Sequence, residues 1–169
     1  DCWIKGGPVP DETLIVRRLG QVERMVVGAP SIAKPFRGMR PDDAKELPFV
    51  SLTPFEGAKV TLSHPNGALS NMDVAVQLST NNIMSLKHAA LSGLGMAVLP
   101  KWFVAPELGS GALIDVFPDW QAAMLDVNAA YLPTRHQPRR LSAFIEVLED
   151  GFRMIPGINC DESVTETFS

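Results

Sequence analysis

Short apolar runs, separated by clusters of glycine, proline and polar residues, recur along the chain and predict β-strands. Several runs are continuously apolar and rich in β-branched residues, which is typical of strands that are covered on both faces. Others alternate apolar and polar positions, as half-buried strands do. The predicted strands span residues 2–4, 14–16, 25–27, 49–53, 59–63, 73–78, 95–99, 112–117 and 125–131.

Helical spacing of apolar residues predicts a helix in the middle of the chain. The polar cluster at residues 79–82, Ser-Thr-Asn-Asn, supplies N-cap candidates, and apolar positions follow at helical spacing from Ile83 to Leu91. Gly93 is suited to end this helix. The predicted strands on either side complete a strand–helix–strand unit, which is the arrangement that builds parallel sheets.

A second helix is predicted towards the C-terminus. Pro138 is suited to its first position, and Gly151 or Pro156 is suited to end it. A short helix is also predicted at residues 31–34, whereas residues 159–169 are polar and aperiodic and are expected to be disordered. Together these elements predict an α/β fold. The apolar face of the second helix consists of Leu141, Phe144, Ile145, Leu148 and Phe152.

Composition places the chain among packed globular proteins. Of its 169 residues 46% are hydrophobic and 20% are charged, and a chain of this length buries enough surface to fold without a disulfide or a metal. Lys and Arg number 15 against 19 Asp and Glu, and the net charge of −4 weighs against a surface that coats nucleic acid. Two cysteines, Cys2 and Cys160, and no visible signal peptide predict a reducing cytosol. No apolar run approaches the ~20 residues of a membrane span, so we expect a soluble, cytoplasmic protein.

Motifs that carry catalysis are absent from the sequence. The run Gly93-Leu94-Gly95 follows a predicted helix and precedes a strand, the reverse of the order in a dinucleotide-binding loop, so we interpret it as a helix-to-strand turn. The sequence contains neither a P-loop nor a Gly-x-Ser-x-Gly nucleophile motif. Its histidines, His64, His88 and His136, lie far apart without metal-ligand spacing. We therefore predict no enzyme activity, no metal and no cofactor.

The order of several segments resembles LysR-type transcriptional regulators over residues 1 to about 155. The strongest similarity is at residues 89–100, Ala-Ala-Leu-Ser-Gly-Leu-Gly-Met-Ala-Val-Leu-Pro, which resembles the family stretch "Ala-x-Ala-Gly-x-Gly-Ile-Ala-x-Leu-Pro". Residues 1–7 resemble the "Asp-x-x-Ile-Arg-x-Gly" strand end, and residues 26–30 look like the strand that leads into "Ala-Ser-Pro". Residues 131–145 resemble "Tyr-Pro … Pro-x-x-x-Arg-Ala-Phe-Ile".

The resemblance implies a periplasmic-binding-protein-like regulatory domain, in which two α/β lobes flank an effector cleft. On that template residues 1–24 finish lobe one, residues 25–125 form lobe two and residues 126–155 return to lobe one, leaving residues 156–169 as a disordered tail. Lobe two would be complete and lobe one partial. The family's winged helix-turn-helix, linker helix and first part of lobe one have no counterpart, so an N-terminally truncated regulator is expected. It would meet DNA only through that absent domain, pair as a homodimer or homotetramer, and have no contact with a membrane.

Ligands of open α/β lobes bind beyond the carboxyl ends of strands. Three predicted strand ends carry suitable groups, at residues 5–7, 51–54 and 79–82. The third also opens a helix, whose free N–H groups and positive dipole end favour a carboxylate. The resemblance supports Ser51 and Thr53, whose positions line the cleft in relatives, whereas Lys5 stands where Arg is usual. An equally open interpretation is that a polar residue of the third strand end serves only as the helix cap. The predicted effector-binding residues are Lys5, Gly6, Ser51, Thr53, Thr80, Asn81, Asn82 and Ile83.

Three functions compete on this scaffold. The leading one is a non-catalytic domain that senses a small effector, a carboxylate or an aromatic acid, and thereby changes DNA binding and transcription by its parent protein. A solute-binding protein of a transport system shares the two-lobe architecture, but it would carry an export signal. An enzyme is disfavoured because the sequence shows no nucleophile–base pair.

Overall fold

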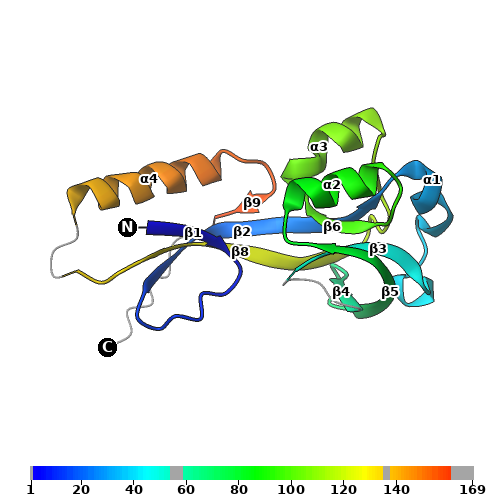
Figure 1. Cartoon of the computed structure of the whole chain (residues 1–169), viewed down its shortest axis with the longest axis horizontal. Coiled ribbons are helices and arrows are strands. Elements are labelled where there is room, and N and C mark those ends of the chain that lie inside the picture. The colour runs from blue at the N-terminus through cyan, green and yellow to red at the C-terminus, as the bar shows by residue number, and fades with distance from the viewer. Residues whose placement is uncertain (1, 54–58, 135–137, 161–169) are drawn as a thin grey trace. The chain divides into compact units, whose positions relative to one another are not determined.

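The computed structural model describes residues 2–53, 59–134 and 138–160. The chain divides into two compact units (Figure 1): unit 1 comprises Asp1–Val22 and Met124–Ser169, and unit 2 comprises Glu23–Ala123. The chain passes from unit 1 to unit 2 inside strand β2 (Ile15–Gly28) and returns inside strand β8 (Gln121–Tyr131). Unit 1 is therefore built from the two ends of the chain, and unit 2 from its middle.

Unit 2 contains a mixed sheet with helices packed against it. Parts of β2 and β8 contribute to this sheet. The remaining strands are β3 (Leu47–Leu52), β4 (Lys59–Ser63), β5 (Leu69–Thr80), β6 (Ala97–Pro100) and β7 (Ile114–Asp115). The helices are α1 (Pro30–Ala33), α2 (Ile83–Leu91) and α3 (Lys101–Ser110), with the 3-10 turns η1 (Lys34–Phe36) and η2 (Pro41–Asp43).

The parallel part of the sheet is centred on β3. This strand pairs with β5 in parallel along its whole length and ends with Leu52 opposite Thr80. On its other side Phe49 bridges in parallel to Met96, directly before β6. Strand β5, helix α2 and strand β6 therefore form the predicted strand–helix–strand unit, with β3 lying between the two strands. Strand β4 is antiparallel to β5, and β2 is antiparallel to β6 and β7.

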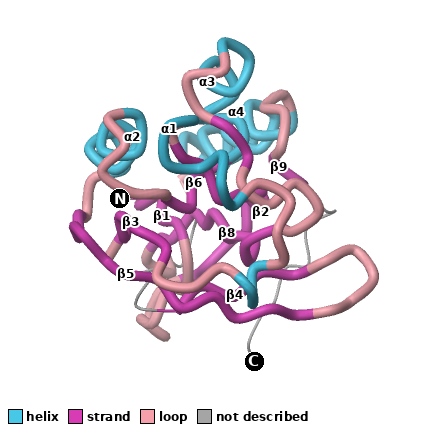
Figure 2. Tube along the Cα trace, turned by 90° about the vertical axis from the view of Figure 1, so that its right-hand side faces the viewer, coloured by secondary structure: helices cyan, strands magenta, loops and turns pink. Residues whose placement is uncertain are grey.

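Apolar clusters lie on both faces of this sheet. Neighbouring residues of one strand, such as Val26 and Val27, are buried in different clusters, as the alternation of side chains along a strand requires. Helices α2 and α3 bury Leu86 and Val104 in the same cluster, on one side of the sheet (Figure 2), whereas α1 contributes Ala33 to the other cluster. The strands are thus covered on both faces, as their continuous apolar runs predicted.

Two glycines allow helix α2 to turn directly into the next strand. Gly93 follows the helix with a φ of +77°, a left-handed conformation that glycine adopts without strain. At Gly95 a Cβ would lie 2.9 Å from the carbonyl carbon of Phe49, so only glycine lets the two backbones approach this closely. The close approach permits the hydrogen bonds from the Met96 N–H to the Pro48 oxygen (2.7 Å) and from the Val50 N–H to the Met96 oxygen (2.8 Å). The interpretation of this run as a helix-to-strand turn is confirmed.

Unit 1 packs one long helix against a small antiparallel sheet. Strand β1 (Cys2–Gly6) pairs with β8, with Cys2 opposite Tyr131. Helix α4 (Arg139–Arg153) runs along these strands (Figure 1) and buries Ile145, with most of its predicted apolar face partly buried around it. Phe144 is the exception: it is 48% exposed, so its assignment to the buried face is wrong. The helix begins at Arg139, directly after Pro138, which precedes it instead of occupying its first position.

Two strand predictions change in extent. The separate strands expected at residues 14–16 and 25–27 are one continuous strand, β2, in which buried Leu19 and Val22 lie among the polar residues between them. The strand expected at residues 112–117 contracts to β7, which pairs with the end of β2 through Ile114 and Asp115, and the Val116 N–H donates to the Val26 oxygen at 3.0 Å.

Two further segments differ from their predictions. Helix α3 is not predicted by the sequence pattern, because Pro106 inside it lacks a backbone donor and disfavours a helix interior. The helix nevertheless forms around buried Val104. Residues 156–169 are not uniformly a disordered tail, since Ile158–Asn159 forms strand β9 and pairs with β2. Residues 161–169 of that predicted tail lie outside the described residues.

Candidate functional site

The carboxyl ends of β3 and β5 bring together most of the predicted effector-binding residues. Ser51 lies opposite Ser79 in the parallel register, and the Thr53 N–H donates to the Thr80 oxygen at 2.9 Å, directly after the last strand pair. The Thr53 hydroxyl reaches the same oxygen at 3.4 Å. Helix α2 begins three residues later, at Ile83. Unit 2 therefore places Ser51, Thr53, Thr80, Asn81, Asn82 and Ile83 at one edge of its sheet.

Asn82 caps helix α2. Its Oδ1 accepts hydrogen bonds from the N–H groups of Met84 (2.9 Å) and Ser85 (3.1 Å), which have no acceptor within the helix itself. Thr80 Oγ1 in turn accepts from the Asn82 N–H at 3.1 Å. The side-chain oxygens of Thr80 and Asn82 thus accept hydrogen bonds at the start of the helix. The Asn82 amide Nδ2 donates to no other described residue.

The exposed edge of the site retains hydrogen-bond donors. The Ile83 N–H, at the first position of α2, has no acceptor among the described residues, and it lies at the positive end of the helix dipole. Thr53, Asn81 and Asn82 are exposed, and Thr80 and Ile83 are half-buried. Ser51 differs, because it is only 2% exposed and its side chain belongs to the interior. Ile83 also packs against the apolar cluster beneath α2.

An ion pair between two helices holds α2 in place. Lys87 of α2 donates to Glu107 of α3 with an Nζ–Oε1 distance of 2.8 Å, and the same Nζ lies 4.3 Å from the centre of the Phe103 ring. This hydrogen bond from Lys87 lowers the pKa of Glu107 below its ordinary value of 4.5. Both side chains are mostly buried. The sequence offered no signal for this pair, because α3 itself was not predicted.

The end of β1 carries the other two predicted residues, Lys5 and Gly6, which belong to unit 1. Lys5 pairs with Asn128 of β8. Asn128 is 7% exposed, and its Nδ2 donates to the Gly7 oxygen at 3.0 Å, while the Gly7 N–H donates to the Asp126 oxygen at 2.8 Å. Asn128 therefore fixes the loop that follows β1. Sequence reasoning overlooked it because it lies in the interior of a predicted strand.

Neither a metal site nor a membrane-spanning helix is found among the described residues. Within residues 2–53, 59–134 and 138–160, no three His, Cys, Asp or Glu side chains gather closely enough to hold a metal ion. None of the helices described is long and apolar enough to cross a membrane. The arrangement at the ends of β3 and β5 is a set of hydroxyl, amide and N–H groups, which is suited to binding.

Solved structures with the same fold include regulatory domains of transcriptional regulators. The regulatory domain of the C227S variant of AphB from Vibrio vulnificus superposes with a TM-score of 0.72 at 23% identity, covering 89% of this chain and 76% of that structure. The regulatory domain of CrgA, a LysR-type transcriptional regulator from Neisseria meningitidis, superposes with a TM-score of 0.71 at 19% identity, covering 89% and 74%. The fold is therefore the mixed α/β, periplasmic-binding-protein-like fold of these domains, as predicted.

Sequence comparison assigns the family. The family model "LysR substrate binding domain" matches residues 1–153, and the chain belongs to this family. Similar proteins include the uncharacterized HTH-type transcriptional regulator YhjC of Escherichia coli K12, which is 30% identical over 156 residues, or 88% of this chain and 50% of the relative. The HTH-type transcriptional activator AaeR of the same strain is 26% identical over 154 residues, or 90% and 50%. The chain thus spans about half the length of the curated relatives it matches.

These findings confirm the resemblance to LysR-type regulators that the segment order indicated. The relatives are transcriptional regulators, which agrees with the prediction that the chain is not an enzyme.

Proposed function

We propose that the chain is the effector-sensing part of a LysR-type transcriptional regulator and that it binds a small carboxylate or aromatic acid at the carboxyl ends of β3 and β5. The observation that carries this proposal is the exposed start of α2. The Ile83 N–H has no acceptor among the described residues, and the Thr53 hydroxyl lies at the same edge of the sheet. A carboxylate at this position would meet the Ile83 N–H and the positive end of a helix dipole.

The hydrogen bonds at the site favour an anionic ligand. The Thr53 hydroxyl donates across 3.4 Å, which is long for a hydrogen bond between oxygens, so turning it towards a carboxylate costs little. The Nδ2 of Asn82 adds a second donor, because only its oxygen is used by the cap. Bonds from neutral donors to a charged oxygen are stronger than those to a neutral one, which supports a carboxylate over an alcohol or an amide.

The wider function rests on the family. We place lobe one at residues 1–24 and 126–155 and lobe two at residues 25–125. The resemblance to the family keeps Lys5 and Gly6 of lobe one among the predicted effector-binding residues. A winged helix-turn-helix elsewhere in the parent protein would bind DNA, and the regulatory domains would pair as homodimers or homotetramers in the cytoplasm. Effector binding would then shift the balance between two arrangements of the regulator. The relatives reported above are transcriptional regulators, and nothing supports the transport alternative.

Ligand-dependent melting of the intact regulator to which this chain belongs tests the proposal. Benzoate, salicylate, 4-hydroxybenzoate and acetate serve as probes, and a bound ligand should stabilise the protein by RT ln(1 + [L]/Kd), about 2.7 kcal/mol at a hundredfold excess over Kd. Thr53→Ala should weaken binding about tenfold, which corresponds to about 1.4 kcal/mol. Thr61→Ala is the matched control, since Thr61 is an exposed strand threonine whose hydroxyl bonds to Asn71 away from the site. Equal affinities in both variants would show that the site is wrongly assigned.

A further inference from the structure

A recess in unit 2 lies near the amino end of β5, whereas the proposed effector site lies at its carboxyl end. It encloses about 250 Å³ and is formed by three segments: residues 38–40, the β4–β5 turn at residues 64–68, and residues 117–120 before β8. The turn lies at the amino end of β5, where the His64 N–H donates to the Ala68 oxygen. The 12 residues of β5 lie between this recess and Thr80.

Aromatic rings form one wall of the recess. Phe117 is fully buried and Trp120 is half-buried. The His64 ring meets the Trp120 ring edge to face, with centroids 5.2 Å apart and an interplanar angle of 65°. His64 Nδ1 accepts from the Asn66 N–H at 3.2 Å, so the ring proton of the neutral imidazole is carried by Nε2. The wall is thus a fixed aromatic surface with one additional donor.

Groups of opposite charge accompany this wall. The Arg40 side chain is 66% exposed, and its guanidinium lies 3.5 Å from Asp42 through one nitrogen, which leaves most of its five N–H donors unused. Asp119 also lines the recess, and its carboxylate forms no ion pair with any described residue. The recess therefore offers a cation and an anion beside an aromatic wall, and a ligand that carries both complementary charges satisfies both.

We propose that this recess binds a small aromatic compound that bears both a carboxylate and an ammonium group, of which an aromatic amino acid is the simplest. Arg40 pairs with the carboxylate, since its planar fork matches carboxylate geometry. Asp119 pairs with the ammonium, and the ring packs on Trp120. The volume suits this class, because it is about eight times the ~30 Å³ share of one water but below the range of drug-sized ligands.

Fluorine NMR of the chain labelled with 5-fluorotryptophan tests the proposal. The three tryptophans, Trp3, Trp102 and Trp120, should give three resonances, and L-phenylalanine should shift only that of Trp120. Two matched probes each lack one charge: 3-phenylpropionate has no ammonium and phenethylamine has no carboxylate. Each should bind at least tenfold more weakly than phenylalanine. Absence of a Trp120 shift at millimolar phenylalanine, or equal binding of all three probes, would overturn the proposal.

Charge-removing variants identify the partners. Arg40→Gln should abolish the preference for phenylalanine over phenethylamine, and Asp119→Asn should abolish the preference over 3-phenylpropionate. Asp73→Asn removes an exposed carboxylate of unit 2 outside the recess and should change neither preference. An Asp73→Asn variant that loses the same preferences would show a general charge effect and contradict the assignment. Thr53→Ala should leave the Trp120 response unchanged, so this proposal and the effector site succeed or fail separately.

Discussion

The Thr80 carbonyl oxygen accepts both the N–H of Thr53, at 2.9 Å, and the hydroxyl of Thr53, at 3.4 Å. Two neighbouring parallel strands are therefore tied together one residue beyond their last pair, at the point where the chain turns into α2. The shorter backbone bond holds the strand ends in register, and the longer hydroxyl bond is free to be exchanged. The Thr53 hydroxyl can therefore leave the Thr80 oxygen for a ligand while the backbone hydrogen bond keeps the two strands paired.

The cap of α2 is tested by Asn82→Ala. The substitution removes the acceptor for two N–H groups of the first turn, so the free energy of unfolding should fall by about 1 kcal/mol in urea titrations. Asn82→Asp keeps the oxygen and should retain most of the stability. The neighbouring exposed Asn81 serves as the control, and Asn81→Ala should cost only a few tenths of that amount. Similar losses at both positions would contradict the cap.

The close approach at Gly95 is tested by Gly95→Ala. The added Cβ would lie 2.9 Å from the Phe49 backbone and force β3 away from the segment before β6, so we expect a loss of about 3 kcal/mol or more. Gly109→Ala is the matched control inside α3, where a Cβ meets nothing within 4 Å. That variant should gain about 0.5–1 kcal/mol from helix propensity. Calorimetry of the two variants should therefore show melting shifts of opposite sign.

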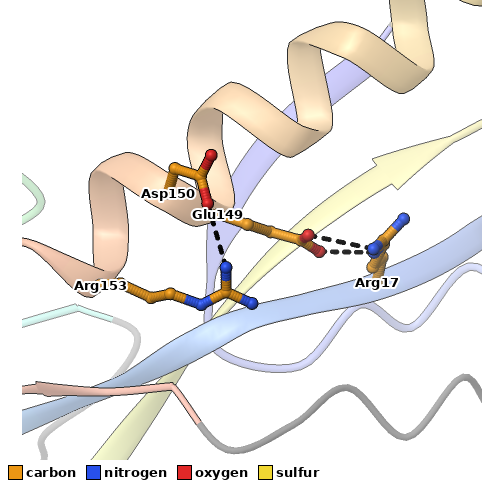
Figure 3. Close-up of polar contacts among 4 residues, drawn as sticks. All are labelled: Arg17, Glu149, Asp150 and Arg153. Atoms are coloured by element: carbon orange, nitrogen blue, oxygen red, sulfur yellow. Dashed lines mark hydrogen bonds and ion pairs between the residues drawn. The ribbon is translucent and has the colours of Figure 1, made fainter.

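Two ion pairs on α4 differ in burial and should differ in strength (Figure 3). Arg17 Nη2 donates to Glu149 Oε2 at 3.0 Å, and Arg17 Nε lies 2.5 Å from Oε1, with Glu149 only 14% exposed. Glu149→Gln should cost about 1–2 kcal/mol, because it leaves a half-buried guanidinium without its charged partner.

The second pair on α4 provides the control. Asp150 and Arg153 are 3.0 Å apart but 76% and 59% exposed, so Asp150→Asn should cost only about 0.3 kcal/mol and lose that effect in high salt. Urea titrations at low and high ionic strength separate the two cases. Equal losses in both variants would show that burial does not set the strength of these pairs.

Asp115 should make unit 2 less stable as the pH rises. Burial raises the pKa of Asp115 above its ordinary value of 3.8, against the hydrogen bond from the Phe117 N–H and the charges of Arg37 and Lys101. Because the folded-state pKa is raised, the protonated form favours folding. This contribution is complete below the unfolded-state pKa and is lost as the pH rises through the folded-state value.

Asp115→Asn tests this pH dependence. Asparagine stays neutral and keeps the Oδ1 acceptor for Phe117, so its Tm should exceed that of the parent chain by a few degrees at neutral pH and match it near pH 3. Asp73→Asn, at an exposed position in β5, serves as the control and should change the Tm little at either pH. A constant difference for Asp115→Asn across this range would contradict a titration effect.

Local patterns in the sequence predict much of this fold because they reflect local physics. The cap, the apolar face and the glycine that ends α2 all lie within residues 79–95. The same reasoning predicts strand ends at residues 53 and 78, within two residues of the observed ends at Leu52 and Thr80. The prediction fails where tertiary packing overrides local preference. Helix α3 forms despite Pro106 because Val104 is buried beneath it.

Contacts between distant segments could not be predicted from the sequence. Lys87 meets Glu107 only because α2 and α3 share one face of the sheet. The recess at Trp120 joins three loops that no single motif connects. Neither site has a spacing along the chain that marks it, and each depends on how the strands are ordered in the sheet.

The construction of unit 1 from both ends of the chain sets the order of folding during synthesis. Strand β1 leaves the ribosome before unit 2, but its partner β8 follows only after all of unit 2 has been made. Pairing across such a sequence separation forms late, since closing the intervening loop costs entropy before any contact compensates it. Until then β1 lacks its partner β8 and carries the exposed apolar side chains of Trp3 and Ile4. A nascent chain stalled within unit 2 would therefore present a surface prone to aggregation and recognised by chaperones.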